Sequence, residues 1–458
     1  MYSLSDTIVA ISTPVGEGGI GIVRLSGADA LPILQKIFRR GRGHSTRQVA
    51  FEPYRLYYGR IVDPETQETL DEVLASYMRA PNSYTREDVA EINCHGGIVP
   101  LRRVLALALR HGARLAEPGE FTLRAFVNGR LDLAQAEAVL DIVRAKTEAS
   151  LRVAVGQLEG KLSDRVRAVR QELVDILAYL EATIDFTHDE IPYEDILPGL
   201  AKAEEDLKKL LAEAERGIIY RQGIRTAIVG RPNVGKSSLL NALLRMDRAI
   251  VTPIPGTTRD TLEETLNLGG IPLCLVDTAG ITAPHNLVER LGIERSRKAL
   301  EQADLVLLVV DGSEPLIAAD QEIAALIGDK PTILVVNKID LSLRASLDGL
   351  LPTATRVQIS ALTGQGLDSL EEAIEETVFA GKVWSSDAPL VSSPRHRDIL
   401  RCALEQVQSA RRSHAEGMAA DFVSIDLKGA INALGEITGE SVTEDLLDTI
   451  FRRFCIGK

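Results

Sequence analysis

The stretch that decides the fold is Gly230-Arg231-Pro232-Asn233-Val234-Gly235-Lys236-Ser237-Ser238, near the middle of the chain. The apolar run at 226–229 predicts a buried strand before it, and the leucine-rich residues 239–244 continue it with helical spacing. A strand, a glycine-bounded loop, Lys-Ser and a helix are the phosphate-binding loop in the context that it requires. Gly230 and Gly235 let backbone N–H groups point at phosphate, Lys236 is expected to reach the β- and γ-phosphates, and Ser237 is expected to ligate Mg²⁺.

Further nucleotide motifs follow in the order that a Ras-like GTPase requires. The first switch is expected at Thr252-Pro253-Ile254-Pro255-Gly256-Thr257-Thr258, and Asp277-Thr278-Ala279-Gly280 is expected to serve Mg²⁺ and the γ-phosphate. The motif Asn337-Lys338-Ile339-Asp340 reads guanine, because a carboxylate at Asp340 accepts hydrogen bonds from N1 and the exocyclic amine, and Ser360-Ala361-Leu362 completes the base pocket. The order predicts a P-loop G domain that binds GTP rather than ATP.

The usual catalytic groups of GTPases are missing from their expected places. The residue after the Asp-x-x-Gly motif is Ile281, which is apolar and does not orient water as glutamine does. Asn233 offers a side-chain oxygen near the developing phosphate charge, where with loop carbonyls it could hold a monovalent cation. Glu289 could act through a bridging water, although a surface carboxylate at a helix N-terminus is the alternative reading.

Composition indicates a soluble globular protein of two to four domains. The chain has 458 residues, of which 45% are hydrophobic and 26% charged, and its net charge of -13 argues against a broad nucleic-acid-coating surface. The N-terminal residues lack the pattern of a signal peptide, and the apolar run at 305–310 is too short to span a bilayer. Four widely spaced cysteines predict a reduced, cytoplasmic compartment without structural zinc or disulfides.

The pattern along the chain predicts an N-terminal α/β domain at 1–120, a helical domain at 121–216 that resumes at 384–458, and an inserted G domain at 217–383. Arg24 lies within an apolar strand, where it is either a solvated edge arginine or an anion ligand. The cluster Arg165, Arg167 and Arg170 is either a solvated helix face or an RNA contact.

The whole chain resembles the MnmE (TrmE) family of bacterial tRNA-modification GTPases. The resemblance is carried by the G-domain motifs and by residues 6–10, 81–85, 95–97, 118–121, 131–138 and the C-terminal Phe454-Cys455-Ile456-Gly457-Lys458. It implies a homodimer with an N-terminal domain that binds 5-formyltetrahydrofolate, and a partnership with the FAD-dependent MnmG. The pair would install carboxymethylaminomethyl-type groups at C5 of the wobble uridine of certain tRNAs. K⁺-dependent dimerisation of the G domains would activate GTP hydrolysis.

The resemblance also implies roles for individual residues. K⁺ ligands would fall on Asn233, Thr252, Ile254 and Thr257, Mg²⁺ ligands on Ser237 and Thr258, and the catalytic carboxylate on Glu289. Folate contacts would fall on Arg24, Glu91, Arg130 and Lys458. Cys455 matches a tail cysteine of the family, for which a catalytic and a structural role stay open.

Two functions of other classes remain as alternatives. One is a regulatory GTPase switch of the ribosome-assembly type, which usually carries an RNA-binding module. The other is a folate-dependent one-carbon transferase in which the G domain only regulates.

Overall fold

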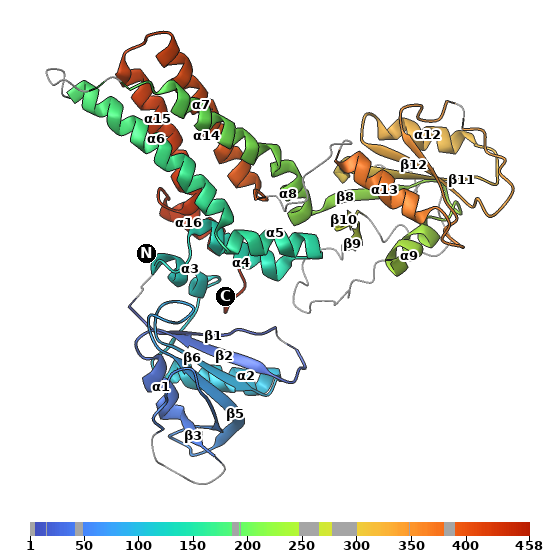
Figure 1. Ribbon diagram of the computed structural model, residues 1–458. Helices are drawn as coiled ribbons and strands as arrows, with labels where there is room; N and C mark the ends of the chain where they lie inside the picture. The colour runs from blue at the N-terminus through green and yellow to red at the C-terminus, as the bar shows by residue number, and fades with distance from the viewer. Residues whose placement is uncertain are drawn as a thin grey trace. The chain divides into compact units, whose positions relative to one another are not determined.

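The computed structural model describes residues 5–14, 16–41, 49–185, 192, 194–246, 265–276, 300–347, 349–379 and 390–458 (Figure 1). The chain forms two compact units. The first is built mainly from Met1–Leu140 and Asn432–Lys458, and the second from Asp141–Val251 and Asp260–Ile431.

The first unit contains the expected N-terminal α/β domain. Among the described residues its sheet has seven strands in the order β3-β4-β5-β6-β2-β1-β7, antiparallel except for the β1–β7 pair. The strands are β1 (Ile8–Ile11), β2 (Gly21–Ser26), β3 (Phe38–Arg40), β4 (Leu56–Val62), β5 (Thr69–Met78), β6 (Val89–Cys94) and β7 (Arg114–Leu115). Apolar residues of alternate strand positions form one core with α1 (Ala30–Ile37) and α2 (Ile98–Arg110).

The placement of Arg24 corrects one interpretation. This residue lies on β2, which is paired on both sides by β1 and β6, so Arg24 is not at a sheet edge. Its side chain is 19% exposed and forms an ion pair with Glu91, directly opposite on β6. The sequence alone does not show which strand of a sheet lies at its edge, because the order of strands depends on distant pairings.

The C-terminal end of the chain completes the first unit. Helix α3 (Glu120–Val127) begins after Gly119, whose φ of 72° is favoured by glycine. Helices α3, α4 (Leu133–Arg144) and α16 (Glu444–Phe451) share an apolar cluster that includes Leu123, Leu133 and Phe451. A Cβ on Gly457 would lie 2.4 Å from the carbonyl oxygen of Ile11, so the last residues pack closely on β1.

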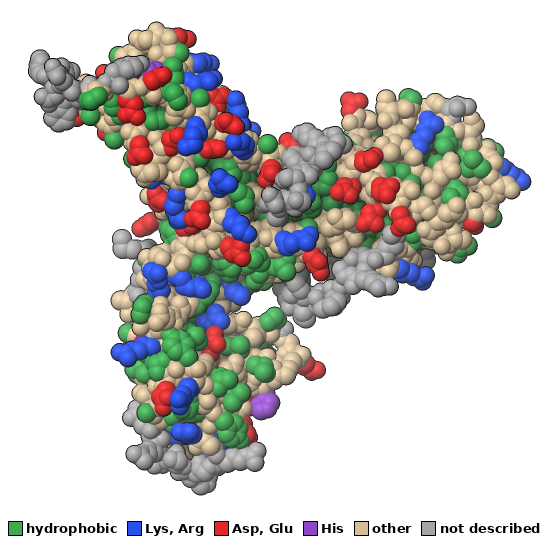
Figure 2. Space-filling view, viewed as in Figure 1, with side chains coloured by type: hydrophobic (Ala, Val, Ile, Leu, Met, Phe, Trp, Pro, Cys, Tyr) green, Lys and Arg blue, Asp and Glu red, His purple; other side chains and the backbone are tan. Residues whose placement is uncertain are grey.

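The second unit begins with long helices, as the spacing of apolar residues predicts. They are α5 (Glu148–Leu158), α6 (Lys161–Asp185), α7 (Leu197–Ala212), α8 (Ala214–Gln222), α14 (Pro394–Ala415) and α15 (Ala420–Thr438). Helix α7 packs on both α6 and α14, which joins segments on either side of the G domain. Lys and Arg side chains are interspersed with Asp and Glu over these helices (Figure 2). Within the basic cluster Arg170 donates to the Ile431 carbonyl at 3.3 Å, so not all three arginines project freely into solvent.

The G domain has the predicted Ras-like sheet. The described strands follow the order β13-β12-β11-β8-β10-β9 and are parallel except for the β9–β10 pair. The strands are β8 (Ile224–Val229), β9 (Thr265–Leu268), β10 (Ile271–Leu275), β11 (Leu305–Asp311), β12 (Thr332–Asn337) and β13 (Thr355–Gln358), with helices α9 (Lys236–Met246), α12 (Ala318–Ile327) and α13 (Leu367–Val378). Apolar clusters cover both faces, as buried parallel sheets require. A search of the described residues finds no helix that is long and apolar enough to cross a membrane.

Candidate functional site

The phosphate-binding loop joins β8 to α9, as predicted. The Lys236 ammonium donates hydrogen bonds to the carbonyl oxygens of Gly230 and Arg231, both at 2.8 Å. A Cβ on Gly230 would lie 2.3 Å from the Val309 carbonyl oxygen, and one on Gly235 would lie 2.1 Å from the Asn337 amide nitrogen. The loop backbone therefore approaches its neighbours so closely that only glycine fits at these two positions.

The guanine motif is joined directly to this loop. The Asn337 side chain donates to the Val234 carbonyl oxygen at 2.8 Å and accepts from the Ala361 amide at 3.0 Å. The Ser360 hydroxyl donates to Asp340 at 2.6 Å, which fixes the orientation of that carboxylate. Leu362 of the base loop is 85% exposed. Thus Asn337 connects the segment that would hold phosphate with the segment that would hold the base.

Lys338 lies between these groups with an unusual backbone conformation. Its φ is 68°, in the left-handed region, and its ammonium lies 2.5 Å from a carboxylate oxygen of Asp311 at the end of β11. Burial disfavours the charged Asp311 carboxylate, but hydrogen bonds from Lys338 and Ser313 outweigh it and keep the pKa of Asp311 below its usual value. The ion pair holds the motif against the β11 strand end. Among the residues that the structure describes, no three or more His, Cys, Asp or Glu side chains form a group that could hold a metal ion.

Burial lowers the pKa of Lys236 to about 8 in the nucleotide-free protein. Bound phosphate favours the charged Lys236 ammonium, so nucleotide binding is expected to raise the pKa of Lys236. At alkaline pH the lysine should therefore take up a proton when nucleotide binds. We expect GDP affinity to fall as pH rises above about 8, as measured by titration with a fluorescent GDP analogue. Binding heats should also depend on the ionisation enthalpy of the buffer. An affinity unchanged between pH 7 and 9.5 would contradict this prediction.

The predicted folate residues come together in the first unit, although they are far apart in sequence. Arg24 forms a 2.8 Å ion pair with Glu91 and lies within 3.5 Å of the Gly457 carbonyl oxygen, next to the terminal Lys458. The Tyr84 ring lies near two cations: its centroid is 5.8 Å from the Arg24 guanidinium and 4.7 Å from that of Arg130. Aromatic and cationic groups at one place suit a flat, anionic ligand.

Two aromatic residues of this cluster were not predicted. Phe121 lies 5.8 Å from Arg24, and Tyr84 donates to or accepts from the Thr122 hydroxyl at 2.9 Å. Burial raises the pKa of Tyr84, although the hydrogen bond with Thr122 and the nearby arginine charges oppose the shift. Tyr84 lies in the stretch 81–85, with a proline and an asparagine, and Phe121 in the stretch 118–121, with a proline and a glycine. These two stretches carry the family resemblance and were the available signal.

Cys455 stays without a defined role. It is exposed, and its carbonyl oxygen accepts hydrogen bonds from the Gly119 and Lys458 amides, both at 3.3 Å. These bonds hold the tail against the turn before α3. They give the backbone of Cys455 a structural contact and leave the thiol accessible.

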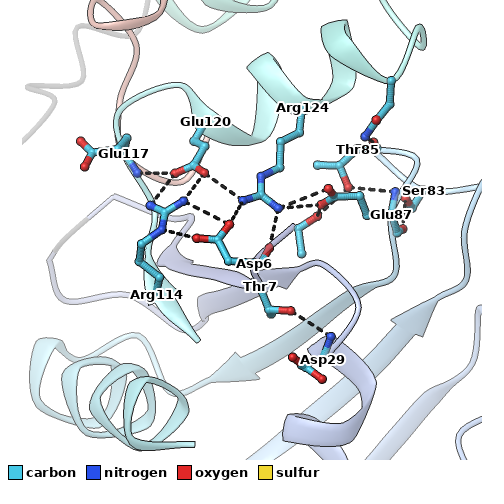
Figure 3. Close-up of polar contacts among 12 residues, drawn as sticks. Asp6, Thr7, Asp29, Ser83, Thr85, Glu87, Arg114, Glu117, Glu120 and Arg124 are labelled. Atoms are coloured by element: carbon cyan, nitrogen blue, oxygen red, sulfur yellow. Dashed lines mark hydrogen bonds and ion pairs between the residues drawn. The ribbon is translucent and has the colours of Figure 1, made fainter. Parts of the chain in front are cut away.

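The first unit also contains an ionic network around a buried arginine, Arg124, that the sequence did not predict (Figure 3). The Arg124 side chain is fully buried and pairs with Asp6 at 2.7 Å, Glu120 at 3.0 Å and Glu87 at 3.2 Å. Arg114 joins Asp6 and Glu120, both at 2.6 Å. The i,i+4 spacing of Glu120 and Arg124 on α3 was the available signal, but it predicts a surface pair rather than a buried one.

Several predicted site residues lie outside the described residues. They are the first-switch residues Thr252, Pro253, Ile254, Pro255, Gly256, Thr257 and Thr258, the second-switch residues Asp277, Thr278, Ala279 and Gly280, and Glu289. Their roles stay predictions. The described part of the predicted GTP site is residues 233–238, Asn337, Lys338, Asp340 and 360–362.

Comparison with known proteins gives a consistent result over nearly the whole chain. Residues 133–455 match the model of the MnmE helical domain, and residues 7–130 match that of the GTP-binding protein TrmE N-terminus. A tRNA modification GTPase MnmE of Desulforamulus reducens is 50% identical, with 99% of this chain and 100% of that protein covered. One of Roseiflexus castenholzii is 53% identical, with 99% of each covered. A solved structure of Era with MgGDPNP and ribosomal RNA is 32% identical over 40% of this chain and 66% of that chain, with a TM-score of 0.27.

Proposed function

The chain belongs to the MnmE family of tRNA-modification GTPases, and we propose that with an FAD-dependent MnmG partner it installs carboxymethylaminomethyl-type groups at C5 of wobble uridine in tRNA. The observation that carries this proposal is the presence of two separate ligand clusters on one chain. The G domain joins a phosphate loop to a guanine motif, and the first unit gathers Arg24, Tyr84 and Arg130 from distant segments. The compartment would be the cytoplasm.

In the G domain we assign roles that follow the predicted motifs. Lys236 would leave the loop carbonyls and bind phosphate oxygens, Ser237 and Thr258 would hold Mg²⁺, and Asp340 would bind the guanine edge. Asn233 has a φ of 66° and projects from the loop as an exposed residue, which suits a ligand for K⁺ with carbonyl groups of residues 252–257. A bound K⁺ would supply the positive charge that an arginine supplies in other GTPases.

In the first unit the cationic cluster suits 5-formyltetrahydrofolate. Arg24 and Lys458 would bind carboxylates of its glutamate tail, and the Tyr84 ring offers an aromatic contact for a flat heterocycle. Glu91 holds the Arg24 guanidinium through the 2.8 Å ion pair and thereby orients it. Arg130 adds a second cation 4.7 Å from the centroid of the Tyr84 ring.

The first unit also carries a surface suited to a second copy of the chain. Leu56, Tyr58 and Leu74 are 66%, 42% and 39% exposed on the sheet face opposite α1 and α2, and Tyr58 faces Leu74 in register. Arg60 and Glu72 face each other on the same two strands. Exposed apolar residues beside one cationic and one anionic residue suit contact with a second copy of the same surface.

A contact within the second unit supports coupling between the G domain and the helices. Lys146, just before α5, donates to Thr265 of β9 at 2.9 Å and to Cys274 of β10 at 3.7 Å. A Cβ on Gly270, at the turn between these strands, would lie 3.2 Å from Ala149 of α5. The β9–β10 hairpin connects the two predicted switch segments. A rearrangement of these segments would therefore move the hairpin against α5.

GTP hydrolysis is expected to be faster in K⁺ than in Na⁺ by about tenfold or more, because the cation replaces a catalytic charge. Asn233→Ala is expected to remove most of this difference. Steady-state hydrolysis at equal ionic strength measures both effects, with Glu322→Ala, at an exposed position of α12 outside the nucleotide site, as the control. Equal rates in the two salts would refute the role of the cation.

The proposed function is tested by reconstituted modification. The purified chain, the MnmG partner, GTP, folate and undermodified tRNA are combined, and wobble nucleosides are measured by mass spectrometry. We expect modified uridine with the wild type, and with Glu289→Ala a loss of at least about tenfold in both GTP turnover and modification. A chain that hydrolyses GTP but leaves uridine unchanged would instead favour a regulatory switch, and modification without GTP turnover would favour a folate-dependent transferase.

A further inference from the structure

A second ionic contact holds the phosphate-binding loop from outside the nucleotide site. Arg231 lies in the loop directly after Gly230, and its guanidinium donates to Glu314 at 2.8 Å. Its Nε atom also lies 3.5 Å from a carboxylate oxygen of Asp320. The Arg231 side chain is 15% exposed and that of Asp320 only 2%, so the second pair is largely shielded from water. Such shielding strengthens the Coulomb attraction between the two charges, and it makes removal of either partner costly because the other stays desolvated.

Asp320 is itself fixed at the start of α12. One of its oxygens accepts from the Ile317 amide at 3.0 Å, so the carboxylate caps the helix while its other oxygen faces Arg231. Asp311 begins the same β11–α12 connection and pairs with Lys338 of the guanine motif. The connection at 311–320 therefore contacts the phosphate loop at one end and the guanine motif at the other.

The backbone of Arg231 is part of the phosphate-binding geometry. Its carbonyl oxygen accepts from the Lys236 ammonium at 2.8 Å, beside the Gly230 carbonyl. Lys236 must exchange these carbonyls for phosphate oxygens when nucleotide binds. The position of the Arg231 backbone therefore affects both the resting place of the lysine and the direction of the neighbouring N–H groups.

We propose that Arg231, held by Glu314 and Asp320, is a positioning residue that keeps the phosphate loop ready to bind nucleotide. The β11–α12 connection then acts as a scaffold that fixes the phosphate loop relative to the guanine motif. Neither Glu314 nor Asp320 belongs to the predicted GTP contacts, so the contribution is made through the loop rather than to the ligand. The inference rests on the nucleotide site proposed above.

The test measures release of a fluorescent GDP analogue from the full-length chain after mixing with excess GDP. The variants are Glu314→Gln and Arg231→Met, with Arg231→Lys as the conservative change. Glu322→Gln is the matched control, because Glu322 is an exposed carboxylate of α12, the helix that follows Glu314 in the chain. It removes the same charge without touching Arg231, and so corrects for the long-range effect of net charge.

We expect release to be about threefold faster for Glu314→Gln and about tenfold faster for Arg231→Met, with Arg231→Lys between the wild type and Arg231→Met. The KM for GTP should rise in proportion, while kcat for Glu314→Gln should change by less than about twofold, because a positioning residue acts on binding. Release rates of both Glu314→Gln and Arg231→Met equal to that of the control would overturn the proposal.

A purely structural role gives a different pattern. It would lower the thermal midpoint of Arg231→Met without changing GDP release by the folded protein, and this result would also overturn the proposal. Since Glu314 is 59% exposed and glutamine has the same shape, Glu314→Gln is expected to fold. If the wild type did not bind the analogue, the nucleotide site itself would be refuted and the inference with it, so the two failures are distinguishable.

Discussion

Asp340→Asn is expected to lower the affinity for GTP by about 10²- to 10⁴-fold and to create affinity for xanthosine triphosphate. The carboxylate accepts two hydrogen bonds from guanine, each of which contributes about 1.5–3 kcal/mol when the acceptor is charged. An asparagine amide offers a donor where guanine also has a donor. Xanthine carries a carbonyl oxygen in place of the exocyclic amine, so the amide can donate to it.

The structure makes this exchange a clean test of base reading. Ser360 donates to one oxygen of Asp340 at 2.6 Å, and the Asn side-chain oxygen can accept the same bond, so the orientation should be retained. Affinities for GDP and xanthosine diphosphate are measured by titration. Asp368→Asn, at an exposed position in the first turn of α13, is the matched control for loss of charge. If Asp340→Asn bound GDP as the wild type does, Asp340 would not read the base.

The arrangement of the G domain could be predicted because its determinants are local. Each motif lies at the end of an apolar strand, and parallel strands bring their carboxyl ends to one edge, so the sheet order follows from the fold class. The structure confirms the Ras-like sheet and places Lys236, Asn337 and Asp340 around connected loops. The contact of Asn337 with Val234 was not predicted, since it joins residues 103 apart in sequence.

The first unit could be predicted less completely, because the contacts that form its ligand cluster are not local in sequence. Its cluster of Arg24, Tyr84 and Arg130 depends on strand order and on a helix that returns to the sheet, neither of which is encoded in a short stretch. The family resemblance supplied the charged residues Arg24, Glu91, Arg130 and Lys458, but not the aromatic rings of Tyr84 and Phe121 that lie beside Arg24. Burial of Arg124 was equally hidden, because a lone arginine on a helix is usually exposed.

Arg124→Met is expected to lower the free energy of unfolding of the first unit by about 3–5 kcal/mol. Removing one member of a buried ionic network leaves its partners desolvated and incompletely paired. Arg114 contacts Asp6 and Glu120, so these two carboxylates would keep one cation, whereas Glu87 would lose its ion pair with Arg124. Because unfolding of a multidomain chain is not two-state, local stability is measured by hydrogen exchange at the amides of β1 and α3. The control Arg102→Met replaces an exposed arginine of α2 and should change this local stability by less than about 0.5 kcal/mol.

Acidification provides an independent test of the same network. A hydrogen bond from Arg114 lowers the pKa of Asp6 despite partial burial. Burial opposes ionisation of Glu120, but hydrogen bonds from Arg114, the Glu117 amide and Arg124 outweigh it and lower its pKa as well. A carboxyl group whose pKa is lower in the folded than in the unfolded chain stabilises the fold at pH values above its unfolded pKa, which is about 4. This stabilisation is lost as the pH falls through the folded pKa.

The wild-type first unit should therefore keep its stability down to about pH 4 and lose it only below. In Arg124→Met one of the cations that favour ionised Asp6 and Glu120 is gone, so both folded pKa values move up toward their unfolded values. The two carboxylates then stabilise the variant less above about pH 4, and acidification removes less stability from it than from the wild type. The double variant Arg124→Met, Glu120→Gln should cost less than the sum of the two single changes, since glutamine leaves no unpaired charge behind. Additive costs, or identical acid profiles for wild type and Arg124→Met, would mean that the buried charges act independently.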